Sequence, residues 1–131
     1  MPLLAGGSLK SVFPKTKRQP EKLAQFYIAQ IIIGIGKLHE RGILHRDLKM
    51  SNVMLDTNGY IKIIDFGLAI ELLSPDDLAQ TFCGTTCYIA PEILAGQGYD
   101  KMVDWWSVGI ILYEMLFGFT PFLDTTKNKI Y

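Results

Sequence analysis

A nearly uncharged stretch close to the end of the chain places the strongest constraint on the fold. Residues 103–119 contain only two charged side chains, Asp104 and Glu114. The stretch is 17 residues long, whereas a helix needs roughly 20 apolar residues to cross a bilayer, and a glutamate in its middle disfavours insertion. We therefore expect no membrane association and a helix over residues 101–117 that is buried on nearly all sides and ends at Gly118.

A second long helix is expected over residues 20–40. Its apolar side chains recur with the helical period, at Leu23, Phe26, Tyr27, Ile31 and Leu38. Pro20 suits the first helical position, and Gly42 suits the C-terminal cap. A short helix is expected after Ser8, which can cap its N-terminus.

The other segments are predicted to be short or irregular. A turn signal at residues 56–59 separates two apolar runs, 53–55 and 60–64, and predicts a β-hairpin. Residues 68–99 show no regular pattern apart from a short helix at 91–94. The expected fold class is α+β and mainly α.

Composition excludes several classes of protein. The chain has 131 residues with 13 basic and 13 acidic side chains, which disfavours binding to nucleic acid through a general positive field. A basic run at residues 15–18 is interpreted as a solvated loop. Two cysteines cannot form a disulfide framework, and residues 1–7 do not resemble a signal peptide, so a cytoplasmic or nuclear location is expected.

Three single-motif interpretations fail on spacing. Residues 34–37 read G-I-G-K but lack the flanking residues of a phosphate-binding loop. The pair Cys83 and Cys87, with His39 and His45, matches no common zinc spacing. No G-x-S-x-G elbow of a serine hydrolase is present.

Four motifs occur in one order along the chain. Residues 45–52 read H-R-D-L-K-M-S-N, residues 65–67 D-F-G, residues 90–92 A-P-E and residues 104–109 D-W-W-S-V-G. Together they resemble the catalytic domain of protein kinases, whose catalytic loop reads H-R-D-L-x-x-x-N. The run T-F-C-G-T at residues 81–85 is most similar to the AGC group of serine/threonine kinases.

The resemblance implies the chemistry of ATP-dependent phosphoryl transfer to a serine or threonine of a protein substrate. It assigns Asp47 as the base that accepts the proton of the substrate hydroxyl, and Lys49 as the cation that stabilises the transferring phosphoryl group. A lysine at position 49 fits the serine/threonine type. Asn52 and Asp65 would supply hard oxygen ligands for Mg²⁺.

The same resemblance implies an ATP site and several structural residues. Adenine would lie against Leu9 and Met54, backed by Ile111 and Met115. The complete set expected to contact ATP is Leu9, Lys49, Asn52, Met54 and Asp65. The structural motif residues would be His45, Phe66, Gly67, Glu92 and Asp104, with His45 and Phe66 stacked and tied to Asp104.

Regulation is also implied by the resemblance. Arg46 precedes the catalytic aspartate, as in kinases whose activation segment is ordered by a phosphate that pairs with arginine. Thr81 is the matching acceptor for an upstream kinase, and its phosphorylation is expected to order residues 68–89, here called the activation segment. Thr85, in the substrate loop, is expected to hydrogen-bond Asp47 and Lys49.

Some positions depart from the AGC pattern. Thr86 and Cys87 stand where Pro-Glu is usual, and so do Met50 and Ser51. Two carboxylates that would pair with basic substrate side chains are therefore absent. Glu114 is the carboxylate of this kind that is still present. We expect no strong preference for arginine before the target residue.

The resemblance covers a partial kinase domain over residues 1–131, from the hinge to the long central helix. The glycine-rich loop, the strand lysine and the final helices of the family have no counterpart in the sequence. We therefore expect an incomplete C-terminal lobe that has little activity alone. The alternatives are a truncated, non-catalytic isoform that acts as a binding module, and a partial gene model.

Overall fold

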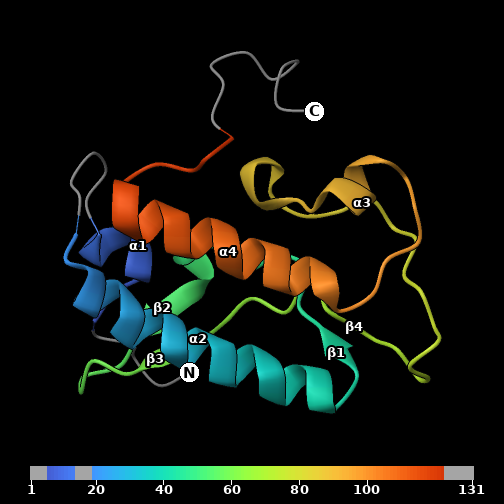
Figure 1. Cartoon of the computed structure of the whole chain (residues 1–131). Helices are drawn as coiled ribbons and strands as arrows, with labels where there is room; N and C mark the ends of the chain where they lie inside the picture. Colours follow the sequence, from blue (N-terminus) through green and yellow to red (C-terminus); the bar gives the residue numbers. More distant parts are fainter. Residues whose placement is uncertain (1–5, 14–18, 123–131) are drawn as a thin grey trace.

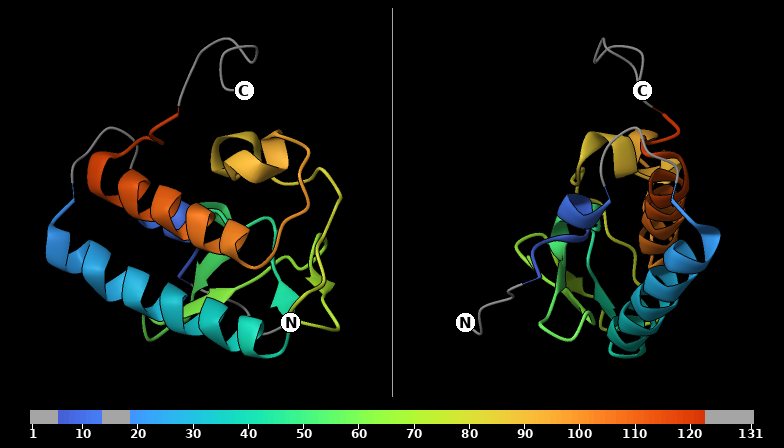
Figure 2. Two further views of the ribbon diagram at one scale, coloured as in Figure 1. Left: turned by 45° about the vertical axis from the view of Figure 1, so that its right-hand side comes forward. Right: turned by 90° about the vertical axis from the view of Figure 1, so that its left-hand side faces the viewer.

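Two long helices, α2 (Glu21–Glu40) and α4 (Met102–Phe117), lie side by side (Figures 1 and 2). The structure is a computed structural model, which describes residues 6–13 and 19–122. The basic run at residues 15–18 lies outside the described residues. The remaining elements are α1 (Leu9–Val12), β1 (Ile43–Leu44), the 3₁₀ helix η1 (Met50–Asn52), β2 (Val53–Leu55), β3 (Ile61–Ile63), β4 (Ile70–Glu71), the 3₁₀ helix η2 (Thr86–Tyr88) and α3 (Pro91–Leu94).

The ends of the long helices follow from local sequence signals. The helix α2 starts at Glu21, one residue later than predicted. Pro20 is the residue just before it, because its ψ of 134° is not helical. Gly42 follows the last turn of α2 with a φ of +73°. Gly118 ends α4 with a φ of +85°, and its N–H donates to the carbonyl of Glu114 at 2.8 Å. Glycine adopts this left-handed conformation without steric cost.

The prediction that α4 is buried on nearly all sides is wrong. Its side chains at Met102, Trp106 and Phe117 are 54%, 36% and 39% exposed. Among the described elements, α2 and the 3₁₀ helix η2 pack most closely against α4, and the three side chains are shielded only in part, as Trp106 is by its stack on Phe122. No described helix combines the length and the apolar character that a bilayer crossing requires.

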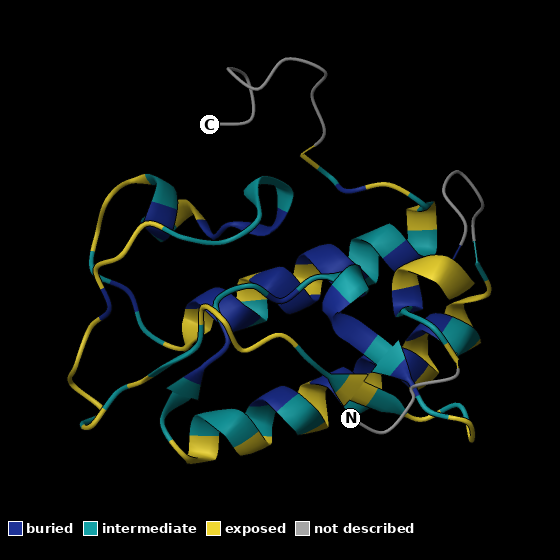
Figure 3. Cartoon of the chain, turned by 180° about the vertical axis from the view of Figure 1, so that it is seen from behind, coloured by how far each residue is buried: buried dark blue, intermediate teal, exposed yellow. Residues whose placement is uncertain are grey.

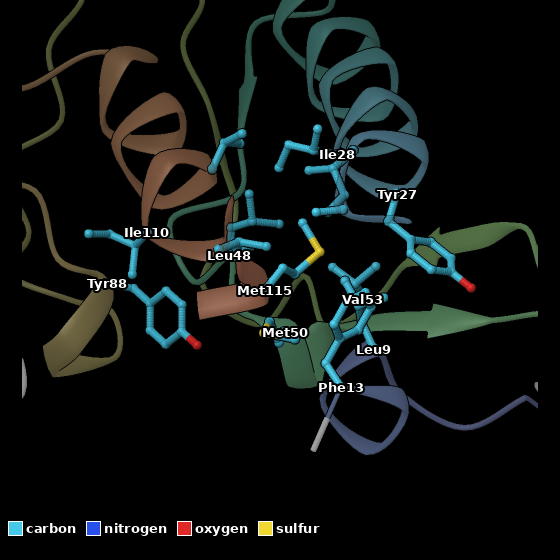
Figure 4. Close-up of a cluster of buried hydrophobic side chains, with 14 of the residues drawn as sticks. Leu9, Phe13, Tyr27, Ile28, Leu48, Met50, Val53, Tyr88, Ile110 and Met115 are labelled. Atoms are coloured by element: carbon cyan, nitrogen blue, oxygen red, sulfur yellow. The ribbon is translucent and has the colours of Figure 1, made fainter. Parts of the chain in front are cut away.

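The larger core cluster lies between α1, α2, α4 and the hairpin. Leu9, Ile31, Val53, Ile111 and Met115 are completely buried in it. Figure 4 shows side chains from all four elements pointing toward one another. Figure 3 shows the same distribution, with buried residues on the facing sides of the two long helices. A smaller cluster joins β1 to the region between Ala79 and Val103.

The predicted hairpin is confirmed, and a second strand pair was not predicted. β2 and β3 are antiparallel, with Val53 opposite Ile63. β1 and β4 are also antiparallel, with Ile43 opposite Glu71, so residues 68–99 are less irregular than expected. An isolated antiparallel bridge joins Ala79 to Tyr99. The observed fold is mixed and mainly helical, with short strands.

Candidate active site

Three side chains from two distant loops meet in one hydrogen-bonded cluster. The Lys49 Nζ donates to Thr85 Oγ1 at 2.9 Å, and the Thr85 hydroxyl donates to Asp47 Oδ1 at 2.6 Å. The Lys49 Nζ also lies 3.4 Å from Asp47 Oδ2, with side-chain exposures of 26% and 12% respectively. Both predicted hydrogen bonds of Thr85 are therefore confirmed. The cluster places a carboxylate and a cation together at a partly shielded surface.

Asn52 fixes the shape of the loop that carries Asp47. It is buried at the end of η1, and its Nδ2 donates to the backbone carbonyl of Asp47 at 2.9 Å. The same Nδ2 lies 3.5 Å from Asp47 Oδ2. The amide of Asn52 thus ties the start of the hairpin to the candidate base.

The hairpin brings Asn52 and Asp65 to the same end. The N–H of Ile64, which precedes Asp65, donates to the carbonyl of Asn52 at 2.9 Å. Asp65 is exposed, with a φ of +61°, and its Oδ1 accepts from the N–H of Gly67 at 3.3 Å. An aspartate tolerates this left-handed conformation better than most residues.

These oxygens fit Mg²⁺ when the phosphates of a nucleotide complete its coordination. Among the described residues no group of three or more His, Cys, Asp or Glu side chains could hold a metal ion. Mg²⁺ in nucleotide sites needs only one or two protein oxygens besides phosphate oxygens and water. An amide oxygen and a carboxylate at one end of a hairpin meet that need, whereas they do not form a cage of protein ligands.

A buried carboxylate holds the start of the loop at residues 45–52. Asp104 in the first turn of α4 is completely buried. Its Oδ1 accepts from the N–H of Arg46 at 2.9 Å, and its Oδ2 accepts from the N–H of His45 at 2.9 Å. Its Oδ2 also lies 2.8 Å from His39 Nε2, a contact that the sequence analysis did not predict.

The predicted link between His45 and Phe66 is confirmed. Their ring centroids are 5.0 Å apart, with an edge-to-face angle of 63°. The His45 Nε2 donates to the carbonyl of Ile64 at 3.0 Å, and its Nδ1 accepts from the N–H of Asp47 at 3.3 Å. The imidazole of His45 therefore connects Ile64, the residue before the D-F-G motif, to the backbone of Asp47.

Arg46 and Thr81 are connected through Tyr99, which the sequence analysis also missed. The Arg46 Nε donates to the carbonyl of Leu68 at 2.6 Å, and its Nη1 donates to the Tyr99 hydroxyl at 3.1 Å. That hydroxyl donates to the carbonyl of Thr81 at 2.7 Å. Burial raises the pKa of Tyr99, and the neighbouring Cys83 adds to this effect. Thr81 itself is exposed.

Glu114 is hydrogen-bonded by a neighbouring tyrosine. The hydroxyl of the buried Tyr88 donates to Glu114 Oε2. Burial raises the pKa of Tyr88 far above its usual value, and the hydrogen bond and the charge of Glu114 raise it further. The phenol therefore stays protonated and keeps the carboxylate engaged.

The two residues predicted to lie against adenine, Leu9 and Met54, differ in exposure. Leu9 is completely buried in the larger core cluster, together with Ile111 and Met115, the two residues expected to back it. Met54 is half-buried in β2, where it pairs with Ser8. Leu9 therefore packs in the core beneath the surface to which Met54 contributes.

Glu92, in the A-P-E motif, lies in the first turn of α3 and is half-buried. Its backbone carbonyl accepts from the N–H of Gln97 at 3.0 Å. No described cation lies within ion-pair distance of its carboxylate. Glu92 therefore lies on a different element from the Asp47, Lys49 and Thr85 cluster and takes no part in its hydrogen bonds.

Comparisons with known proteins agree with these features. The family model for the protein kinase domain matches residues 1–131. Protein kinase C zeta type of Oryctolagus cuniculus is 49% identical over 123 residues, which are 94% of this chain and 21% of that protein. The catalytic subunit of cAMP-dependent protein kinase of Arthrobotrys oligospora is 47% identical over 132 residues, which cover 100% of this chain and 25% of that protein. The cAMP-dependent protein kinase type 3 of Saccharomyces cerevisiae is 45% identical over 131 residues, 100% of this chain and 32% of that protein.

The chain thus spans between about a fifth and a third of the length of these curated relatives. The relatives confirm the similarity to serine/threonine kinases of the AGC group. The four motifs, the family match and these identities together show that the chain belongs to the protein kinase domain family.

Proposed function

We propose that this chain is part of a serine/threonine protein kinase that transfers the γ-phosphoryl group of ATP to a hydroxyl group of a protein substrate. The observation that carries the proposal is the cluster of Asp47, Lys49 and Thr85, in which a carboxylate and an ammonium group share one hydroxyl. Phosphoryl transfer needs such positioned charges more than it needs a protein nucleophile.

Asp47 has the geometry of a base for the substrate hydroxyl. Its Oδ1 already accepts a hydrogen bond from a hydroxyl group, that of Thr85. The carboxylate orients a substrate hydroxyl in the same way and takes its proton as the phosphoryl group is transferred. Lys49 lies 3.4 Å from the other carboxylate oxygen and places positive charge beside the transferring group.

Asn52 and Asp65 would hold Mg²⁺, which supplies neutralisation of the phosphate charge when it is bound. The hydrogen bond from Ile64 to Asn52 supports this role, because it keeps both ligands at one end of the hairpin. Met54 would contact adenine, and Leu9 would support that surface from the core. The presence of Asp47, Asn52 and Asp65 favours catalysis over a non-catalytic binding role.

The proposal also covers architecture and regulation. Residues 1–131 would form part of the larger lobe of the kinase domain, from the hinge to the central helix α4. Thr81 would accept phosphate from an upstream kinase, since it is exposed and linked to Arg46 through Tyr99. Two free thiols, at Cys83 and Cys87, support a reducing location such as the cytoplasm or nucleus.

The test combines turnover with a binding signal that needs no turnover. Transfer of radioactive phosphate from ATP to casein is measured with Mg²⁺, and Asp47→Asn is expected to lower it about 10²- to 10⁴-fold. Asp56→Asn is the matched control, because Asp56 lies in the hairpin turn and accepts from the N–H of Asn58. In parallel, Mn²⁺ with ADP is added to the isotope-labelled chain.

The proposal expects paramagnetic broadening centred on Asn52 and Asp65 in the nuclear magnetic resonance spectrum. Broadening that is centred elsewhere would contradict the metal assignment. Equal phosphate transfer by Asp47→Asn and Asp56→Asn, at a rate clearly above that without protein, would contradict the assignment of the base.

A further inference from the structure

A tight turn at residues 74–77 carries a serine that the proposed function does not use. Ser74 precedes Pro75, and the carbonyl of Ser74 accepts from the N–H of Asp77 at 3.0 Å, which closes the turn. The Asp77 Oδ2 in return accepts from the N–H of Ser74 at 2.9 Å. Proline suits the second position of such a turn because its φ is fixed. These two bonds use the peptide groups of Ser74 and leave its hydroxyl for other contacts.

The hydroxyl of Ser74 is available for modification. Its Oγ accepts one long hydrogen bond, from the N–H of Asp76 at 3.4 Å, and no residue in the described part of the chain accepts its proton. Residues 75–78 are all exposed, and Leu73 is 90% exposed. The turn lies between two fixed points, the β1–β4 ladder and the bridge from Ala79 to Tyr99. An enzyme that binds the turn in an extended form therefore has to break only the bonds that close it.

The structure distinguishes this serine from a second residue in the same local sequence. Ser74-Pro75 and Thr120-Pro121 are the two places where a proline follows a serine or threonine. Thr120 is only 7% exposed, whereas Ser74 is half-buried between exposed neighbours. The dipeptide alone would select both residues, and accessibility selects Ser74.

We propose that Ser74 is phosphorylated by a separate, proline-directed protein kinase. Its Oγ attacks the γ-phosphorus of ATP held by that enzyme. The new O–P bond forms, the bond from the γ-phosphorus to the β–γ bridging oxygen breaks, ADP leaves, and the hydroxyl proton passes to a base of the enzyme.

The neighbours of Ser74 favour recognition of proline over recognition of an acidic side chain. Proline has no N–H, so it fits an apolar pocket that offers the peptide no acceptor. Pro75 is exposed and can enter such a pocket. Asp77, the acidic residue three positions after Ser74, is held by the N–H of Ser74. The proposal does not depend on the catalytic activity of this chain.

The charges around Ser74 determine what a phosphate does there. A phosphoserine carries a charge of about −2 at neutral pH. Ser74 lines a cavity of about 300 Å³ together with Asp100 and Lys101, and Asp76 and Asp77 belong to the turn itself. The phosphate therefore meets three carboxylates and one ammonium group.

Phosphorylation should therefore open the turn. A phosphate next to acidic side chains acts by repulsion of like charges. Asp77 is affected most, because its carboxylate already bonds the N–H of the modified residue. The effect is opposite to the one expected for Thr81, whose phosphate would pair with Arg46. The two modifications would act on one segment in opposite directions.

The first experiment measures modification of the chain of residues 1–131 by a purified proline-directed kinase of the mitogen-activated class. Radioactive ATP supplies the phosphate, mass spectrometry locates it, and a reaction without the added enzyme corrects for transfer by the chain itself. Ser74 should be modified roughly tenfold faster than Thr120, although synthetic peptides of the two sites should react at similar rates. Pro75→Ala should slow the reaction at Ser74 about tenfold. Asp76→Asn, at an exposed position of the same turn, is the matched control and should change the rate little.

The second experiment measures amide hydrogen exchange in the phosphorylated chain. The N–H of Ala79, which donates to the carbonyl of Tyr99 at 2.8 Å, should exchange roughly tenfold faster. The N–H of Ile64, which donates to Asn52 in the hairpin, should keep its rate. Since salt screens repulsion between exposed charges, the difference at Ala79 should shrink in about 1 M sodium chloride.

Several results would overturn the proposal. Equal incorporation at Ser74 and Thr120 in the folded chain, or equal rates for Pro75→Ala and Asp76→Asn, would overturn the assignment of the site. Unchanged or slower exchange of Ala79 after phosphorylation would overturn the predicted opening, and protection that is lost in Lys101→Gln would show that the phosphate pairs with this lysine instead. None of these measurements uses phosphoryl transfer by the chain, so failure of this proposal and failure of the proposed function are separate results.

Discussion

Replacing Asp104 with asparagine tests how strongly the buried carboxylate holds the catalytic loop. The two side chains have the same shape, so packing is unchanged and only the hydrogen bonding differs. The carboxylate accepts from three donors, the N–H groups of His45 and Arg46 and the Nε2–H of His39. An asparagine keeps one acceptor oxygen and turns an NH₂ group toward at least one of the two peptide N–H groups.

The structure gives the size of the effect. A hydrogen bond to a charged group contributes a net value of roughly 1.5–3 kcal/mol, and a neutral one roughly 0.5–1.5 kcal/mol. The two bonds that survive in Asp104→Asn therefore lose about 1 kcal/mol each. The peptide N–H that faces the NH₂ group remains buried without an acceptor, which costs roughly 1–3 kcal/mol. The free energy of unfolding should fall by about 3–5 kcal/mol in total.

Urea unfolding followed by circular dichroism measures this change. With a denaturant slope near 2 kcal/mol per molar, the midpoint should fall by about 2 M. Asp100→Asn is the control, since the Asp100 carboxylate is only partly buried and accepts from the N–H of Met102 at 2.9 Å. Asparagine offers the same acceptor oxygen to this N–H, so the control should change by less than about 0.5 kcal/mol. A loss in Asp104→Asn no larger than in the control would refute the reasoning.

Three further results are expected. Because the folded state raises the pKa of Tyr88, the unfolded chain releases this proton first, so stability should fall above about pH 10 by up to roughly 1.4 kcal/mol per pH unit. Tyr88→Phe should reduce that slope in urea titrations between pH 9 and 11, and an unchanged slope would contradict it. Tyr99→Phe should cost roughly 0.5–1.5 kcal/mol and speed limited proteolysis near Thr81, because the carbonyl of Thr81 loses its donor; unaltered cleavage would count against the link. Thr85→Ala should lower phosphate transfer about ten- to a hundredfold, whereas Thr85→Ser keeps the hydroxyl and should not; equal rates would exclude a role for this hydroxyl.

Local signals in the sequence were sufficient for the long helices and the hairpin. Gly42 and Gly118 mark helix ends because only glycine adopts their backbone conformation without strain. The turn at residues 56–59 determines the register of β2 and β3. The motifs likewise predicted the contacts among Asp47, Lys49 and Thr85, since the resemblance carries their spatial relation.

The contacts that were missed depend on tertiary structure. β1 and β4 pair only two residues each, 43–44 with 70–71, and such short strands show no alternation of apolar and polar side chains. Tyr99 gave no signal, because a single tyrosine in an irregular segment does not indicate its partners. The partial exposure of α4 was missed because hydropathy does not show which neighbours are present.

His39 could have been found from the helical period. Ile31 and Ile35 are completely buried, and His39 follows them at the same four-residue spacing on α2. A titratable side chain that continues a buried stripe needs a polar partner. The sequence does not show that this partner is Asp104, which lies 65 residues further along the chain.

The two-residue ladder between β1 and β4 leaves the activation segment unequally anchored along its length. Residues 72–84 are held at separate points, by the ladder that precedes them, the bridge from Ala79 to Tyr99 and the hydrogen bond from Tyr99 to the carbonyl of Thr81. Thr85 lies at the end of this stretch, directly before η2, which packs on α4 and contains the buried Tyr88. A stretch with few fastenings opens at a lower free energy than the core unfolds. Local opening of residues 72–84 and global unfolding are, in this architecture, two separate thermodynamic quantities.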